Sequence, residues 1–249
     1  QDQRADLASV LRATSLSRVI NTIKLIEDRY KTFLVLKDLV YTDKYGVNER
    51  DHIQKIVEKA FWLFGEEYAL VTADKRLDTS LRKYLSILDG NNNSSDIAVA
   101  NSHNKRMDIF LTRRDLDESS IKNVVLELKR PDRKIGIEEL QQLEKYMDTV
   151  LETPEFNDKA EIWHFYLIGR EYKDTQIQRR IKSGERTGEK SLTLESDNAK
   201  LFVKTWSEVF NEFEQRFNFL DRQLKLERDK LASEFANADE ATGYIQQLN

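Results

Sequence analysis

The sequence predicts an α/β sandwich in which a mixed sheet is flanked by helices. Two observations carry this prediction: short apolar runs typical of strands alternate with amphipathic stretches at helical spacing, and long helical repeats lie near both ends of the chain. Only 8 Gly and 2 Pro occur among 249 residues, which favours long helices and limited loops. We therefore expect a central sheet between long N-terminal and C-terminal helices.

The first half is expected to be mainly helical. Its elements are, in order, a long helix over residues 15–42, a second helix over 48–65, a strand over 68–72, a short helix over 77–88 and a loop rich in Asn and Ser over 89–104. Asn48 is expected to cap the second helix, with Asp51 three residues on as in a capping box, and Gly65 ends it.

The second half supplies most of the expected sheet. Its elements are, in order, a hairpin of strands over 107–111 and 124–128, a helix over 137–150, a buried strand over 162–168, a polar and basic stretch over 175–190, short strands over 192–194 and 201–203, and a long helix over 206–235. The hairpin matters most, because it brings polar side chains of two neighbouring strands together.

Composition limits the classes of protein that fit. A hydrophobic fraction of 39% and a charged fraction of 34% are typical of a soluble chain with a packed core. The absence of Cys excludes disulfides and thiolate zinc sites and is consistent with a cytoplasmic location. The apolar runs are much shorter than the ~20 residues needed to cross a bilayer, so no membrane is expected. With a net charge of -4, any nucleic acid must be bound by a local basic surface.

The hairpin carries the candidate chemistry. Strand alternation places Glu127 and Lys129 on one face and Leu128 on the other, and Asp108 lies on the partner strand. Mg²⁺ prefers oxygen ligands, which the two carboxylates and the Leu128 carbonyl can provide. Lys129 can orient or deprotonate an attacking water and offset charge that develops on phosphorus. These residues therefore predict metal-assisted phosphodiester hydrolysis.

A plainer interpretation stays open, because the acid-x-lysine spacing is common. It recurs here at 132–134 and at 171–173, and a solvated face with a cross-strand ion pair is the usual explanation of an isolated case. Pro131 and Asp132 imitate the start of a nuclease signature, but they fall in the turn after the strand. What sets Glu127 apart is its central place in an apolar strand that follows another carrying Asp108.

Three further residues are candidates for the same site. Gln142 and Tyr146 are four residues apart and so share one helix face, where the amide can fix a metal-bound water or a phosphate; the alternative is a polar edge of the helix. Glu49 is either a third metal carboxylate or a first-turn acid favoured by the helix dipole. It is placed on the inward stripe, four residues before Ile53. His52, His103 and His164 show no ligand spacing and receive no metal role.

Basic residues provide candidate contacts to phosphates. Arg179, Arg180 and Lys182 lie in a stretch where cations outnumber acids, and Arg130 directly follows the acid-x-lysine strand. The alternative for each is a solvated loop residue.

Together, Asp108, the Glu127-Leu128-Lys129 run and the Gln142-x-x-x-Tyr146 pair resemble the PD-(D/E)xK nuclease superfamily, with Met107 in place of its nominal proline. The wider pattern over residues 45–222 resembles the nuclease domain of the Shedu antiphage family. The resemblance implies a restriction-endonuclease-like core and DNA cleavage that depends on Mg²⁺, with Mn²⁺ as a substitute, in bacterial defence.

Residue by residue, the resemblance implies that Glu49, Asp108 and Glu127 hold metal, that Lys129 is catalytic and that Gln142 supports the site; Tyr146 is expected to contact DNA. Residues 1–44 and 223–249 are then a helical segment and a helical extension outside the nuclease domain. The resemblance also suggests that the chain is the effector end of a larger machine with a fused or associated sensor or ATPase. The rival hypothesis is an inactive nuclease-fold module used for DNA or protein binding and assembly.

Assembly and stability complete the expectations. The helices over 16–40 and 206–235 carry more apolar surface than a modest sheet can cover, which predicts a symmetric dimer or a tetramer. The alternative is that these helices pack on each other within one chain. Because clustered carboxylates at an empty metal site repel, Glu127→Ala and Lys129→Ala are expected to abolish cleavage and leave folding intact.

Overall fold

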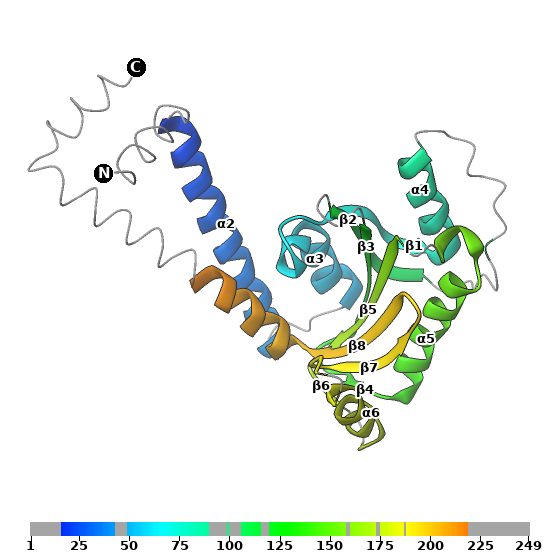
Figure 1. Ribbon diagram of the computed structural model, residues 1–249. Coiled ribbons are helices and arrows are strands. Elements are labelled where there is room, and N and C mark those ends of the chain that lie inside the picture. The colour runs from blue at the N-terminus through cyan, green and yellow to red at the C-terminus, as the bar shows by residue number, and fades with distance from the viewer. Residues whose placement is uncertain are drawn as a thin grey trace, which may run out of the picture. The chain divides into compact units, whose positions relative to one another are not determined.

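The computed structural model describes residues 16–42, 49–89, 99, 106–115, 120–157, 160–172, 175–186 and 188–218 (Figure 1). The chain divides into two compact units. Residues 35–211 form the unit that contains the sheet, and the other unit comprises residues 1–34 and 212–249.

The sheet unit is built on a six-stranded mixed sheet. Their spatial order is β1 (Ala69–Arg76), β2 (Arg106–Asp115), β3 (Ser120–Leu128), β5 (Glu161–Gly169), β8 (Ala199–Thr205) and β7 (Leu192–Ser196). The three central strands β3, β5 and β8 are parallel, and the outer pairings are antiparallel. A separate parallel pair joins β4 (Lys134–Ile135) to β6 (Glu171–Tyr172). The expected mixed α/β architecture is thus confirmed, and the parallel centre is a feature that periodicity alone could not supply.

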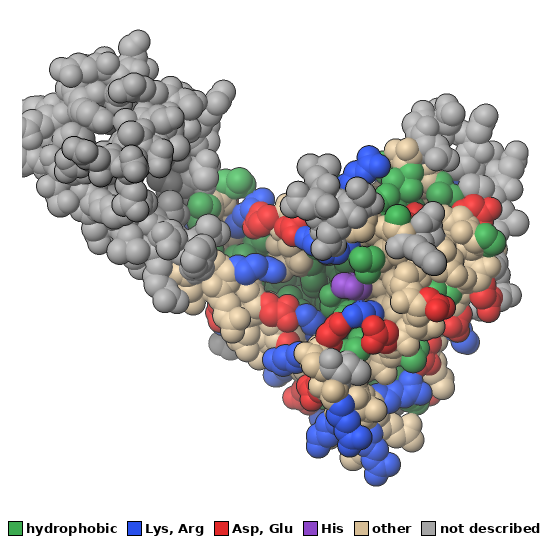
Figure 2. Space-filling model, in the orientation of Figure 1, with side chains coloured by type: hydrophobic (Ala, Val, Ile, Leu, Met, Phe, Trp, Pro, Cys, Tyr) green, Lys and Arg blue, Asp and Glu red, His purple; other side chains and the backbone are tan. Residues whose placement is uncertain are grey.

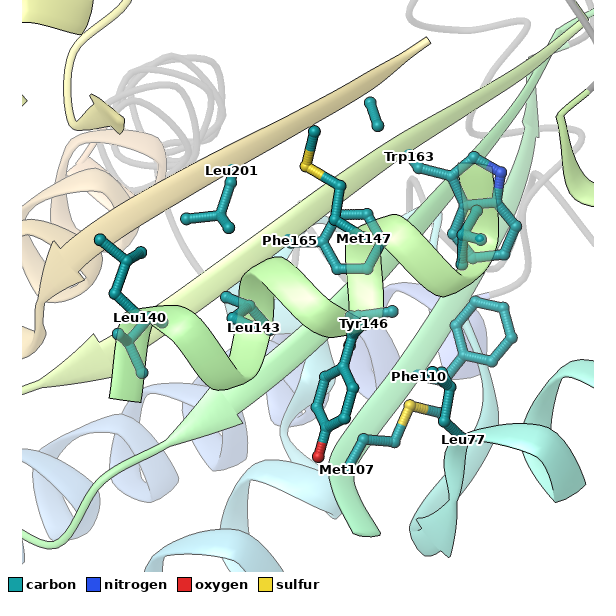
Figure 3. Packing of buried hydrophobic residues seen from close by; sticks show 14 of the residues in the cluster. Leu77, Met107, Phe110, Leu140, Leu143, Tyr146, Met147, Trp163, Phe165 and Leu201 are labelled. Atoms are coloured by element: carbon teal, nitrogen blue, oxygen red, sulfur yellow. The ribbon is translucent and has the colours of Figure 1, made fainter. Parts of the chain in front are cut away.

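Helices cover both faces of this sheet. On one face lie α4 (Leu77–Asp89) and α5 (Ile137–Leu151), whose apolar side chains pack on the strands around Phe110, Trp163 and Phe165 (Figure 3). On the other face a π-helical turn η2 (Glu49–Gln54) contacts β2 and β3, and α3 (Lys55–Lys59) follows it (Figure 1). Buried aromatic rings in contact fix the core, as between Phe110 and Trp163 with 5.6 Å between centroids.

The second predicted helix differs most from expectation. Instead of one α-helix over 48–65, the chain forms η2, then α3, then the 3₁₀ turn η3 (Phe61–Phe64). Gly65 does end this segment: its φ is 154°, and a Cβ there would lie 2.7 Å from the Tyr68 ring. The π-helical turn breaks the 3.6-residue spacing on which the inward placement of Glu49 was based. Asn48 and the side chains of Glu49 and Asp51 lie outside what the structure describes.

The basic stretch over 175–190 is largely helical, which was not predicted. Its helix α6 (Thr175–Glu185) buries only Ile177 and Ile181, so the apolar periodicity is too short to indicate a helix. A short 3₁₀ turn η5 (Pro154–Phe156) connects α5 to β5. Most of the expected loop over 89–104, and the terminal helix beyond residue 218, lie outside the described residues.

The second unit pairs two long helices. The N-terminal part of α2 (Leu16–Tyr41) packs on the helix that begins at residue 206, through rings of Tyr30 and Phe217 4.4 Å apart and of Phe33 and Phe213 4.7 Å apart. These aromatic residues therefore contact each other within one chain, which agrees with the alternative prediction that the two long helices pack on each other. Leu25 and Leu34 of α2 stay exposed, and the oligomeric state stays a prediction. Among the described residues, no helix combines the length and apolarity needed to cross a membrane.

Candidate active site

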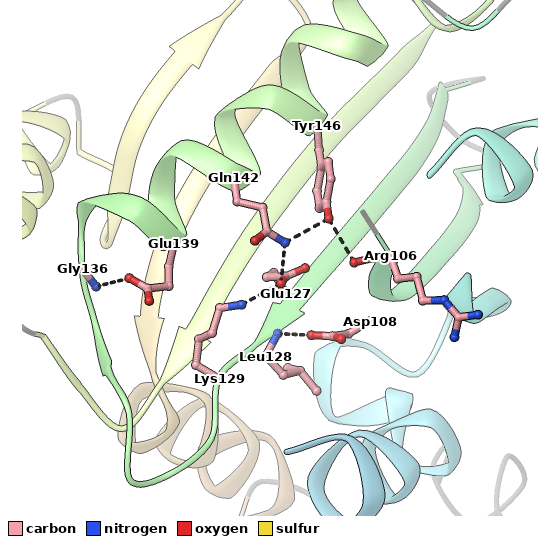
Figure 4. Close-up of polar contacts among 9 residues, drawn as sticks. All are labelled: Arg106, Asp108, Glu127, Leu128, Lys129, Gly136, Glu139, Gln142 and Tyr146. Carbon is pink, nitrogen blue, oxygen red and sulfur yellow. Dashed lines mark hydrogen bonds and ion pairs between the residues drawn. The ribbon is translucent and has the colours of Figure 1, made fainter. Parts of the chain in front are cut away.

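Asp108 and Glu127 lie on the same face of adjacent strands. The β2–β3 register pairs Phe110 with Val125, and both of these side chains belong to the core beneath α5. Asp108 lies two residues before Phe110, and Glu127 lies two residues after Val125. Because side chains alternate along a strand, both acids lie on the same face as Phe110 and Val125. Lys129 follows directly after β3 on that face (Figure 4). The hairpin therefore brings the predicted acids together by local pairing.

A buried ion pair forms the centre of the site. Lys129 Nζ lies 2.7 Å from Glu127 Oε1, and the two side chains are 8% and 5% exposed. Gln142, which lies on α5, donates a hydrogen bond from its Nε2 to the same Glu127 oxygen, at a distance of 2.8 Å (Figure 4). Burial of this depth removes the solvated-face interpretation of the acid-x-lysine run, because water does not screen the pair.

Asp108 accepts one hydrogen bond at its carboxylate and another at its backbone carbonyl. Its Oδ2 accepts a hydrogen bond from the Leu128 N–H at 2.6 Å, within the acid-x-lysine run itself. Its own carbonyl accepts from Gln54 Nε2 at 3.1 Å. Charge-assisted hydrogen bonds of this length are strong, so the carboxylate is fixed beside Glu127.

Tyr146 helps to hold the Gln142 side chain in position. The Gln142 amide donates to the Tyr146 oxygen at 3.0 Å, and the Tyr146 hydroxyl donates to the Arg106 carbonyl at 3.0 Å (Figure 4). Burial raises the pKa of the Tyr146 phenol, and the charge of Glu127 raises it further, so the hydroxyl stays protonated as a donor. The ring is fully buried, which suits a support for Gln142. Its contact with DNA stays a prediction.

Two carboxylates, rather than three, are described at this site. Within the described ranges, no group of three His, Cys, Asp or Glu side chains could hold a metal ion. Mg²⁺ is commonly held by one or two protein carboxylates completed by waters and phosphate oxygens. Asp108 and Glu127 provide two such carboxylates on one face of adjacent strands. The donor set therefore fits a hard divalent cation.

Arg130, Arg179, Arg180 and Lys182 lie in different settings. The Arg180 guanidinium is bonded to Glu144 and so anchors α6 to α5, the helix of Gln142. Arg179 and Lys182 are exposed on α6. Figure 2 shows Lys and Arg side chains gathered in the region where Figure 1 labels α6. Arg130 is exposed and lies 3.4 Å from Asp132, which sits in the turn as expected.

Gln54 is a site residue that sequence reasoning missed. It is buried at the last position of η2, and its Oε1 has no hydrogen-bond partner among the described residues. A buried amide with one unsatisfied oxygen is uncommon. The sequence shows only a polar residue between the apolar Ile53 and Ile56, which does not indicate a contact with Asp108.

Searches of protein-family models, of curated proteins and of solved structures found no match for this chain. The functional assignment therefore depends on the geometry of the site.

Proposed function

We propose that this protein is a metal-dependent DNA endonuclease that hydrolyses phosphodiester bonds in bacterial antiphage defence. One observation carries the proposal: the buried Glu127–Lys129 pair, which Gln142 contacts, lies beside a backbone-bound Asp108. Burying charged and polar groups costs stability unless they are fully paired, and such clusters concentrate at functional sites. An α/β sandwich with a central mixed sheet is compatible with a restriction-endonuclease-like core.

Each residue has a distinct role in this proposal. Asp108 and Glu127 hold Mg²⁺ or Mn²⁺, and the ion, when bound, supplies an activated water and offsets charge on the phosphate. Lys129 Nζ, 2.7 Å from Glu127, orients the water and stabilises negative charge. Gln142 keeps the Glu127 carboxylate in place, and Glu49 remains a candidate third ligand.

DNA binding is assigned to exposed cations after β3 and on α6. Arg130 follows the active-site strand, and Arg179 and Lys182 project from α6. Their contacts to phosphates would position the duplex without reading its sequence. Assembly into a dimer or tetramer, and a fused or associated sensor or ATPase, belong to the same proposal.

A non-catalytic nuclease-fold module is the second candidate. It is favoured by the closed arrangement of the ion pair, in which Lys129 already neutralises Glu127, and by the lack of a described third carboxylate. In that case the cluster would hold β3 to α5 and would have no metal affinity.

One experiment separates the two functions. Purified protein is incubated with supercoiled and linear DNA in Mg²⁺, Mn²⁺ or EDTA, alongside Lys129→Met and the surface control Lys134→Met. The nuclease proposal expects cutting that requires a divalent ion, persists in Lys134→Met and is lost in Lys129→Met. Cutting that survives EDTA or Lys129→Met would overturn it. Absence of cutting together with no calorimetric binding of Mn²⁺ would favour the non-catalytic module.

A further inference from the structure

A polar cavity lies in the sheet unit, at the carboxyl ends of the parallel strands. Its volume is about 480 Å³, within the range of small-molecule sites. Arg170 and Glu171 reach it just after β5, and Ser207 reaches it just after β8. Carboxyl ends of parallel strands are where open α/β sheets commonly bind ligands. None of the residues proposed for cleavage lines this cavity.

The charge of the cavity suits an anion. Lys37 and Arg170 contribute two cationic groups to its wall, and Glu171 contributes the one acidic group. The Glu171 carboxylate is 2.8 Å from Lys134 Nζ, which lies outside the cavity, and the Lys134 hydrogen bond, together with the charges of Lys134 and Arg170, lowers the Glu171 pKa. The lining residues therefore carry two positive charges and one negative charge, and phosphate groups complement such a surface.

An aromatic surface lies beside these cations. The Tyr41 ring is 38% exposed, and the buried Phe210 supports it edge-on with 6.0 Å between centroids. The Arg170 guanidinium carbon is 5.7 Å from the centre of the Tyr41 ring. An exposed ring that is held rigidly next to cations can stack on a nucleobase while the cations contact its phosphate.

We propose that this cavity binds a nucleoside phosphate, with the phosphate at Lys37 and Arg170 and the base against Tyr41. The site does not depend on nuclease activity, because no proposed catalytic residue contributes to it. Two sources share this chemistry: a free mononucleotide or nucleoside triphosphate, and the 5′-phosphorylated end of a DNA strand.

Calorimetric titration of the full chain in EDTA tests the proposal without any cleavage. The probes are inorganic phosphate, AMP, ATP and a short 5′-phosphorylated oligonucleotide with its unphosphorylated twin. We expect AMP or ATP to bind at least about tenfold more tightly than inorganic phosphate, since stacking adds to charge. Arg170→Gln and Tyr41→Leu should each weaken binding about tenfold, whereas Arg133→Gln, an exposed arginine outside the cavity, should not.

The outcomes are distinct. Preference for the free nucleotides identifies a small-molecule site, and preference for the phosphorylated oligonucleotide over its twin identifies a strand-end site. Binding that ignores Arg170→Gln and Tyr41→Leu, or equal affinity for phosphate and AMP, would overturn the proposal. No binding of any probe to a chain that unfolds cooperatively would also overturn it. Loss of DNA cutting has no bearing on the result.

Discussion

Replacing Lys129 by Met tests whether the buried pair is part of a metal site. The substitution removes the cation 2.7 Å from Glu127 and leaves a carboxylate that is 5% exposed beside Asp108. Removing one partner of a buried ion pair typically costs about 3–5 kcal/mol. For a chain of this size, each kcal/mol lowers Tm by about 2–4 °C, so a fall of roughly 6–20 °C is expected in EDTA.

Lys134 provides a matched control. It also contacts a glutamate, Glu171, at 2.8 Å, but these side chains are 60% and 54% exposed. Water screens such a pair, so Lys134→Met should leave Tm nearly unchanged. Because the two distances, 2.7 and 2.8 Å, are similar and the burial differs, the comparison isolates the effect of the buried environment.

Divalent metal should reverse the loss. In Lys129→Met, Mn²⁺ can replace the ammonium as the countercharge of Glu127 and Asp108, so its addition should raise Tm more than in the wild type. Thermal unfolding followed by circular dichroism, in EDTA and in Mn²⁺, measures both effects. The reasoning fails if Lys129→Met costs no more than Lys134→Met. If the loss is large but Mn²⁺ restores none of it, the cluster is structural.

Three other predictions concern pH, salt and assembly. Burial, aided by the charge of Lys200, lowers the pKa of His164 from 6.5 to about 4. As pH falls, the unfolded chain therefore binds this proton before the folded chain does, and stability is lost between pH about 6.5 and 4. The urea midpoint of His164→Phe should depend less on pH over that window, and an unchanged pH dependence would contradict this. Arg179→Gln and Lys182→Gln should each reduce the salt dependence of DNA binding by about one unit of slope, and an unaltered slope would exclude phosphate contacts there. Light scattering should give at least twice the mass of one chain, and a monomer at micromolar concentration would refute assembly.

The parts of the site that could be predicted are those fixed by short-range geometry. Asp108 and Glu127 meet because a hairpin of neighbouring strands determines its own register, and Gln142 reaches them with Tyr146 because four residues make about one helical turn. Gln54 could not be predicted. Its contact with Asp108 depends on a π-helical turn that no spacing in the sequence indicates.

The burial of Glu127 and Lys129 is the second feature of the site that could not be predicted from the sequence. Repulsion between carboxylates predicted that Glu127→Ala would leave folding intact, which presumes that nothing nearby neutralises them. The structure instead pairs Glu127 with a buried lysine, so we now expect that substitution to destabilise the fold by leaving Lys129 unpaired. Local alternation indicates which face a side chain takes, but it does not indicate how deeply α5 buries that face.

The parallel pairing of β3 with β5 determines when the site can form as the chain folds. The β2–β3 hairpin needs only neighbouring residues, whereas the Lys129 N–H bonds to the Ile168 carbonyl, 39 residues later. Contacts at such sequence separation form slowly, because a long loop must close first. During synthesis the two acids can therefore meet early, while Lys129 is fixed only after β5 has been made and has docked. A chain that ends before residue 168 should contain both acids and lack the backbone contact that orders the lysine.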